Sequence, residues 1–288
     1  MVVILLAVTA CGSETGRNVT SDDGDAAGAD QPAESLVSAD YDGRFRTIAT
    51  VLESPQHGPQ LCYGVDESLP PQCEGTDIAG WDWSTVDHEA ANGTKWGRYT
   101  VIGTYDGDTF TLTEPAAMGG ESGAPWADEI ETPCPEPEDG WQPVDPALAT
   151  EAAFQEAALR ARDSDGFGGL WIDQQIPDGQ ITEQNANDPK RFVLNVTTTG
   201  DVEAMELALR EVWGGSLCVS TASHTAAELV QVQRGIRDIP GLLSSGIDEV
   251  RGKVDLQVLV ATEELQAELD ERYGAGAVRL VGMLEPID

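Results

Sequence analysis

The chain has 288 residues, of which 51 are Asp or Glu and 16 are Lys or Arg, and its formal net charge is -35 at pH 7. This charge argues against nucleic acid and anionic lipid headgroups as partners, because proteins bind them by neutralising phosphates with Lys and Arg. The length that follows the first 40 residues suggests two modest domains, since a domain holds about 150 residues.

The N-terminus carries an apolar run, residues 2–8, which ends in small residues and Cys11. A helix needs roughly 20 apolar residues to span a bilayer, so this shorter run is typical of a secretory signal peptide. Val8-Thr9-Ala10-Cys11 resembles the lipobox of bacterial lipoproteins. The resemblance implies that residues 1–10 are removed and that Cys11 carries a lipid, which would hold the protein on the extracytoplasmic face of the cell membrane.

Residues 11–40 begin at the lipidation site and continue as an acidic segment. Residues 12–40 hold seven acidic residues, one Arg and almost nothing large and apolar. Such a composition buries too little surface to offset the entropy of ordering, so we predict a disordered tether. Flexible-coil scaling gives it a reach of roughly 30 Å from the membrane.

Residues 41–115 are predicted to form an all-β module. Residues 96–105 alternate between two faces, and Asp106-Gly107 marks a tight hairpin into the next strand. We expect about five strands to close into a small barrel of the oligonucleotide/oligosaccharide-binding type, with Trp81 and Trp83 inside it.

Residues 116–149 are rich in Gly, Pro and acidic residues and show no periodicity, so we interpret them as an interdomain linker. The linker contains Trp126 and Trp141. Aromatic residues more often lie in a core, but an exposed tryptophan can stack on a glycan ring or contact a protein partner. These two are therefore our candidates for a binding site.

Residues 150–288 predict an α+β module with an internal repeat. Thr150 is a suitable N-cap for a first helix, and the pattern beyond it is β, β, α, β, α, β, β, α, β. Within that series, residues 191–219 and 253–283 share one plan of strand, helix, glycine and strand. Thr225 and Glu228 form a capping box that begins the middle helix.

The helices of the two repeated segments each carry one apolar stripe, so each can cover a sheet but cannot stand alone. This pattern predicts a two-layer α+β module built from repeated ferredoxin-like βαβ units. The predicted fold class is therefore α+β, with a small barrel-like β module followed by the repeated module.

Four cysteines besides Cys11 are expected to form disulfides, because their number is even and the chain is expected to be exported. They are Cys62, Cys73, Cys134 and Cys218. Three pairings are possible. A short loop containing two prolines favours Cys62 with Cys73, and Cys134 with Cys218 would then join the two domains. A zinc site would need closer Cys or His spacing than the sequence offers.

Three motifs resemble a segment of uncharacterised actinobacterial exported lipoproteins. They are Gly58-Pro59-Gln60-Leu61-Cys62, Pro70-Pro71-Gln72-Cys73 and Gly80-Trp81-Asp82-Trp83. The resemblance implies a bond between Cys62 and Cys73 and a structural role for residues 81–83, and it implies no activity.

The C-terminal half, particularly residues 217–236 and 245–260, is similar in plan to the pro-regions of secreted serine proteases of the α-lytic and streptogrisin type. Those pro-regions chaperone and inhibit a protease that follows on the same chain, whereas this sequence ends at Asp288. The resemblance implies a protease-modulating role.

No motif predicts a catalytic residue, a metal site or a cofactor. Gly214-Gly215-Ser216-Leu217-Cys218 departs at its last position from the Gly-x-Ser-x-Gly turn of serine hydrolases. His57, His88 and His224 have no identifiable acid–base partner in the sequence. The sequence thus favours a non-catalytic envelope lipoprotein that binds a protein or a cell-wall component such as a glycan. The alternatives are a protease-modulating protein and an enzyme without a recognisable motif.

Overall fold

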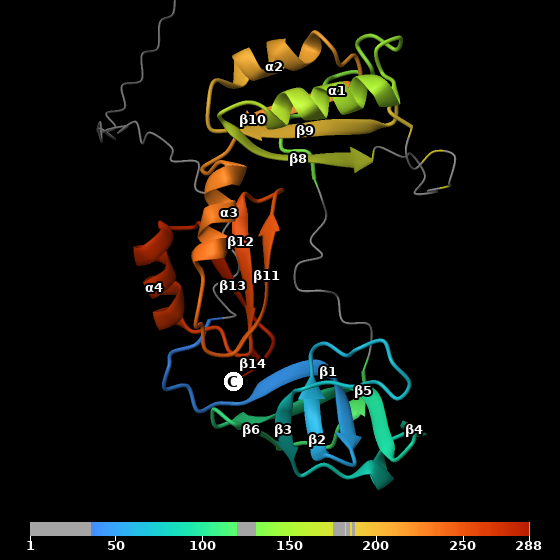
Figure 1. Ribbon diagram of the computed structural model, residues 1–288, viewed down its shortest axis with the longest axis vertical. Helices are drawn as coiled ribbons and strands as arrows, with labels where there is room; N and C mark the ends of the chain where they lie inside the picture. The colour runs from blue at the N-terminus through green and yellow to red at the C-terminus, as the bar shows by residue number, and fades with distance from the viewer. Residues whose placement is uncertain (1–35, 120–130, 175–181, 183–184, 186–187, 288) are drawn as a thin grey trace, which may run out of the picture. The chain divides into compact units, whose positions relative to one another are not determined.

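A computed structural model describes residues 36–119, 131–174, 182, 185 and 188–287 (Figure 1). The expected signal peptide, Cys11, most of the acidic tether and Trp126 lie outside the described residues. Within these residues the fold is mixed α/β, with four helices and three sheets. No helix in the described part of the chain has the length and apolarity needed to cross a membrane.

The N-terminal sheet contains a small closed barrel of five strands, as predicted. Its strands are β1 (Phe45–Ser54), β2 (His57–Cys62), β3 (Thr76–Ala79), β5 (Thr94–Tyr105) and β6 (Thr109–Leu112). They pair in the order β1-β2-β3-β6-β5, and β5 pairs back with β1 to close the ring. All pairings in the ring are antiparallel except β3 with β6, which is parallel.

Three short strands extend this sheet. They are β4 (Glu89–Ala91), β7 (Ala117–Met118) and β14 (Glu285–Pro286). The first two pair with β5, while β14 comes from the C-terminal end of the chain and pairs with β1. The barrel sheet therefore includes residues that lie more than 200 positions apart in the sequence.

The barrel interior is formed by the alternating apolar face of its strands. Tyr99, Val101 and Phe110 are fully buried there, which confirms the two-faced pattern predicted for β5. Trp83, in the short 3-10 helix η2 (Trp83–Thr85), is buried in the same cluster, and Trp81 packs against it. Both tryptophans therefore pack with the hydrophobic core of the barrel module, Trp83 buried and Trp81 partly buried.

The rest of the chain contains two units with the same order of elements, αββαβ. The first unit comprises α1 (Glu151–Arg162), β8 (Phe167–Gln174), β9 (Phe192–Thr198), α2 (Val202–Arg210) and β10 (Ser216–Thr221). The second comprises α3 (Ala226–Gly235), β11 (Leu242–Asp248), β12 (Lys253–Val258), α4 (Glu263–Tyr273) and β13 (Val278–Gly282). The element series predicted from residue 150 onward is confirmed.

Each unit has its own three-stranded sheet. The central strand, β9 or β12, is antiparallel to the strand before it and parallel to the strand that follows the second helix. The two helices of each unit cover one face of its sheet (Figure 1). The ferredoxin-like plan is not confirmed, because βαββαβ would give each sheet a fourth strand.

Each of the four helices begins next to a residue whose polar side chain caps its N-terminus. Thr150, Asp201, Thr225 and Thr262 each accept a backbone N–H bond at a helix N-terminus. Thr225 and Glu228 form the predicted capping box. The inward stripes of α2, α3 and α4 bury Leu209, Leu229 and Leu269, whereas α1 buries three alanines.

Two disulfides are present, Cys62–Cys73 and Cys134–Cys218. We call them the barrel disulfide and the linker disulfide. The pairing favoured by the loop length is therefore confirmed. The linker disulfide joins residue 134 of the segment between the barrel and α1 to β10, so it attaches that segment to the first αββαβ unit.

Candidate ligand-binding site

A pocket of about 830 Å³ is formed by three segments of the chain that come together beside the β5–β6 hairpin. We call it the hairpin pocket, and its volume falls within the range of known small-ligand sites. It is lined by residues 37–42 and 45, residues 104–107, and residues 240–241, 259–260 and 262. The three segments are distant in the sequence, and each is held by backbone hydrogen bonds.

The first segment is fixed by an extended contact with the C-terminal unit. Val37 donates its N–H to the carbonyl of Ala261 at 3.0 Å, and its own carbonyl accepts the N–H of Glu263 at 2.9 Å. Leu259 donates its N–H to the carbonyl of Gly241 at 2.9 Å. The two bonds of Val37 fix the first lining segment to the C-terminal one, and the bond of Leu259 fixes residues 240–241 to residues 259–262.

The base of the hairpin pocket is apolar. Val37, Phe45 and Leu259 line it and are 7%, 3% and 7% exposed. All three also belong to the hydrophobic cluster of the barrel, so the base is continuous with the core. An apolar group of a ligand that contacted these residues would be removed from water, which would favour binding.

Two tyrosines add aromatic surface to the pocket. Tyr105, the last residue of β5, donates its hydroxyl to the carbonyl of Gly107 at 2.5 Å. Tyr41 donates its hydroxyl to the carbonyl of Arg44 at 3.0 Å and packs edge-on against Phe45, with ring centroids 5.0 Å apart. Since both hydroxyl protons are already donated, the tyrosines offer a ligand their rings and oxygen lone pairs.

The charged residues that line the pocket are all acidic. They are Asp40, Asp42 and Asp106, all exposed, and no Lys or Arg occurs among the lining residues. Asp106 accepts the backbone N–H groups of Thr109 and Asp108 at 2.8 and 3.0 Å, and these bonds lower the pKa of its carboxyl. Asp106 therefore stays ionised at neutral pH.

The negative charge also affects the neighbouring phenol. Burial raises the pKa of Tyr105, and the carboxylates of Asp108 and Asp106 raise it further. The phenol therefore remains neutral at physiological pH, beside the ionised carboxylate of Asp106.

A second hollow, about 860 Å³ in volume, lies on the barrel between the β1–β2 turn and the loop closed by the barrel disulfide. It includes His57, Asp66 and Glu74 but no Phe, Tyr or Trp. It lacks the aromatic surface that typically orients a ligand, so the hairpin pocket is the stronger candidate.

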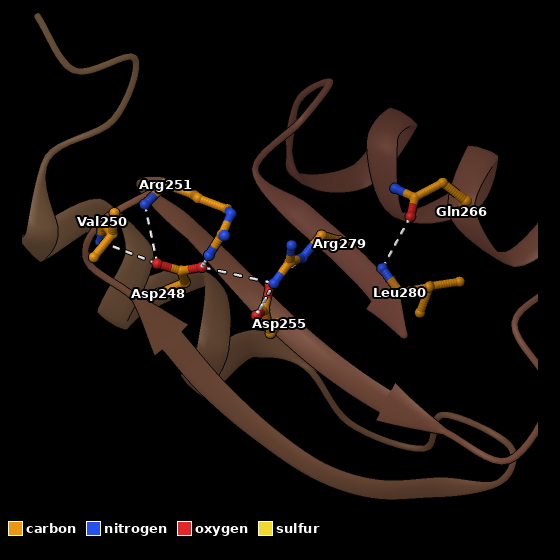
Figure 2. A network of polar contacts seen from close by, with 7 residues as sticks. All are labelled: Asp248, Val250, Arg251, Asp255, Gln266, Arg279 and Leu280. Atoms are coloured by element: carbon orange, nitrogen blue, oxygen red, sulfur yellow. Dashed lines mark hydrogen bonds and ion pairs between the residues drawn. The ribbon is translucent and has the colours of Figure 1, made fainter. Parts of the chain in front are cut away.

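A third cluster, on the sheet face of the second unit that faces away from α3 and α4, is a network of charges (Figure 2). Arg279 binds Asp255 through two nitrogens and lies 3.6 Å from Asp248, while Arg251 lies 2.7 Å from Asp248. Asp248 also accepts the backbone N–H groups of Val250 and Arg251, both at 3.0 Å. Each carboxylate has a cation, so we interpret the network as structural.

The pKa of Asp248 reflects this environment. Burial alone would raise it, but hydrogen bonds from the side chain and backbone of Arg251, with the charges of Arg251 and Arg279, bring it below its usual value. The carboxylate is thus held ionised by its neighbours.

Only one of the two candidate tryptophans lies within the described residues. Trp141 is half-buried and is not among the lining residues of the hairpin pocket, and Trp126 lies outside the described residues. Sequence analysis missed Tyr41 and Tyr105. The one signal that could have indicated them is their position beside acidic residues, in Asp40-Tyr41-Asp42 and Tyr105-Asp106.

Among the described residues, no group of three or more His, Cys, Asp and Glu side chains is arranged to hold a metal ion. Nδ1 of His57 and Nδ1 of His88 each contact a backbone carbonyl close in sequence.

Comparison with known proteins adds no relative. No protein-family model matches the chain, and no curated protein matches its sequence.

Proposed function

We propose that this protein is a non-catalytic lipoprotein of the cell envelope that binds a protein or a cell-wall component in the hairpin pocket. The observation that carries the proposal is the composition of the pocket, which joins an apolar base, two tyrosine rings and a set of carboxylates. Its lining contains no His, Cys or Lys that could act as a base or a strong nucleophile at neutral pH.

The strand order of the barrel supports a binding role. We propose that the barrel is of the oligonucleotide/oligosaccharide-binding type, because its five strands close in the order β1-β2-β3-β6-β5 with one parallel pair. Barrels of this type bind ligands with one sheet face and with loops that include the one between their last two strands. Here that loop is the β5–β6 hairpin, whose residues line the pocket.

The lipid attachment at Cys11 and the location on the extracytoplasmic face belong to the same proposal. They are supported by the resemblance of residues 8–11 to a lipobox. The charge of -35 makes nucleic acid an unfavourable ligand for the barrel, which leaves glycans and proteins as the classes to test.

The test is a cross-linked pull-down from native envelopes of the source bacterium, with the intact protein, a Cys11→Ala form and a Tyr105→Ala form compared. We expect a partner in near-stoichiometric amount with the intact protein, much less with Tyr105→Ala, and loss of membrane association with Cys11→Ala. A partner retained fully by Tyr105→Ala would contradict the assignment of the hairpin pocket.

Tyr105→Phe is the matched control, since it keeps the ring and removes only the hydroxyl that is bonded to Gly107. Circular dichroism of each variant shows whether the barrel is intact.

A further inference from the structure

The hairpin pocket has an unbalanced set of charges and hydrogen-bonding groups, which restricts the chemistry of its ligand. Its three carboxylates are exposed, and no Lys or Arg among the lining residues neutralises them. The carboxylates accept hydrogen bonds and cannot donate them when ionised. A ligand that complements the pocket must therefore bring donors, and a positive charge would match it best.

The apolar base adds a second requirement. Val37, Phe45 and Leu259 line the same pocket as the carboxylates and are largely buried, so a well-matched ligand has an apolar part as well as its charged group. Lys and Arg side chains have this form, because an aliphatic stem carries the cation. Tyrosine rings also attract such cations through their faces.

The remainder of the molecule favours the same class of partner. A net charge of -35 attracts a basic protein over a longer range and repels acidic ones. Glycans without an amine would satisfy the rings but would leave the three carboxylates without a counter-charge.

We propose that the hairpin pocket takes a lysine or arginine side chain from a basic segment of a protein partner. This inference rests on the proposed function and names the partner class for the same pocket. The stem of the side chain contacts Phe45 and Leu259, and its cation lies among Asp40, Asp42 and Asp106.

The test uses the full chain in the Cys11→Ala form and a fluorescent hexapeptide of Gly and Ser that holds two lysines. The same peptide with both lysines Nε-acetylated is the uncharged probe. We expect fluorescence anisotropy to show binding of the lysine peptide at low salt, weaker binding at high salt, and no binding of the acetylated peptide.

The pocket is then tested with an Asp40→Asn/Asp42→Asn variant, which should reduce the affinity by about tenfold if two exposed charge contacts are lost. A Glu138→Gln/Asp139→Asn variant changes the net charge equally at exposed residues outside the pocket lining, and it should stay within about twofold of the parent. Both variants alter exposed side chains, so both are expected to fold.

Equal losses in the two variants would overturn the inference, because only the overall charge would then matter. Equal binding of the acetylated peptide, or no binding of either peptide, would also overturn it. Binding of the neutral glycan chitotetraose at an affinity that Asp40→Asn/Asp42→Asn leaves unchanged would overturn it in favour of a glycan. The proposed function stands or falls separately, on whether Tyr105→Ala loses its envelope partner.

Discussion

Asp248 provides a direct test of whether the charge network in Figure 2 stabilises the second αββαβ unit. Its side chain is 12% exposed, lies 2.7 Å from Arg251, and accepts two backbone N–H groups at the β11–β12 turn. Asp248→Asn keeps the shape and one oxygen acceptor but removes the negative charge. The variant therefore isolates the contribution of the ionised form.

The expected loss is about 2 kcal/mol, since hydrogen bonds to a charged group contribute about 1.5–3 kcal/mol. Arg279 still pairs with Asp255, and Arg251 remains partly solvated, so no fully buried charge is left alone. In a protein of this length the loss corresponds to a fall in Tm of about 4–8 °C. Urea unfolding at pH 7 measures it directly, with exposed Asp139→Asn as the control.

The lowered pKa of Asp248 determines how its contribution to stability changes with pH. The pKa of Asp248 lies below its usual value of 3.8, so its stabilisation is fully present above that pH and is lost as the pH falls through the folded-state pKa. The stability difference between the parent and Asp248→Asn should thus be constant near neutrality and should shrink in acid. A difference that does not change down to about pH 2 would refute this reasoning.

Five further variants test the charge network, the two disulfides and two glycines by urea unfolding. Arg279→Met should cost more than Asp248→Asn, about 3–5 kcal/mol, because it leaves Asp255 without its main cation; a smaller loss would contradict our interpretation of the network. Replacing both cysteines of the linker disulfide with serine should lower the free energy of unfolding by about 4.6 kcal/mol, and the same change in the barrel disulfide by about 2.8 kcal/mol. The difference is expected because the two bonds close loops of 84 and 11 residues. The reverse order would argue that the disulfides do not stabilise the protein mainly through the entropy of the unfolded chain. Gly169→Ala would place a Cβ 2.5 Å from the carbonyl oxygen of Glu249, so it should lower the free energy of unfolding by about 1–3 kcal/mol. Gly246→Ala is the control, because the space around its Cβ is open, and its stability should stay within about 0.5 kcal/mol of the parent.

Local signals account for what the sequence predicted well. Thr150, Thr225 and Gly274 act through bonds or backbone angles within a few residues of themselves, and the helices begin or end at them. The Asp106-Gly107 turn is equally local, because Asp106 accepts N–H groups two and three residues ahead and Gly107 has a φ of +106°. Such features can be predicted from a single sequence without any knowledge of the fold.

Strand partners were less predictable, because periodicity identifies a strand but not its neighbours. The ferredoxin-like expectation counted βαβ units correctly and assumed larger sheets than the structure has. At β8, the contacts reach beyond the unit. A side chain at Gly169 would meet Glu249 of the second unit, and the N–H of Leu170 is bonded to the carboxylate of that residue. Periodicity along β8 gives no sign of this contact.

The hairpin pocket was missed for a related reason. Tyr41, Tyr105 and Leu259 meet only because the chain returns to the barrel through the contacts of Val37 and β14. Neither contact has a periodic pattern. The sequence instead indicated Trp126 and Trp141; Trp141 lies outside this pocket, and Trp126 lies outside the described residues.

The two αββαβ units show how a pair of outward-facing residues on neighbouring parallel strands can be stabilised by different chemistry. On the sheet face opposite the helices, Asn195 of β9 lies beside Cys218 of β10, and Asp255 of β12 lies beside Arg279 of β13. In the first unit the pair is covered by the linker, through the linker disulfide and a hydrogen bond from Asn195 to Thr132. In the second unit an ion pair serves instead. The two parallel strands of a βαβ unit place their outward-facing residues side by side. A polar residue on the outward face of both strands therefore predicts that the two side chains bind each other or a segment that covers them.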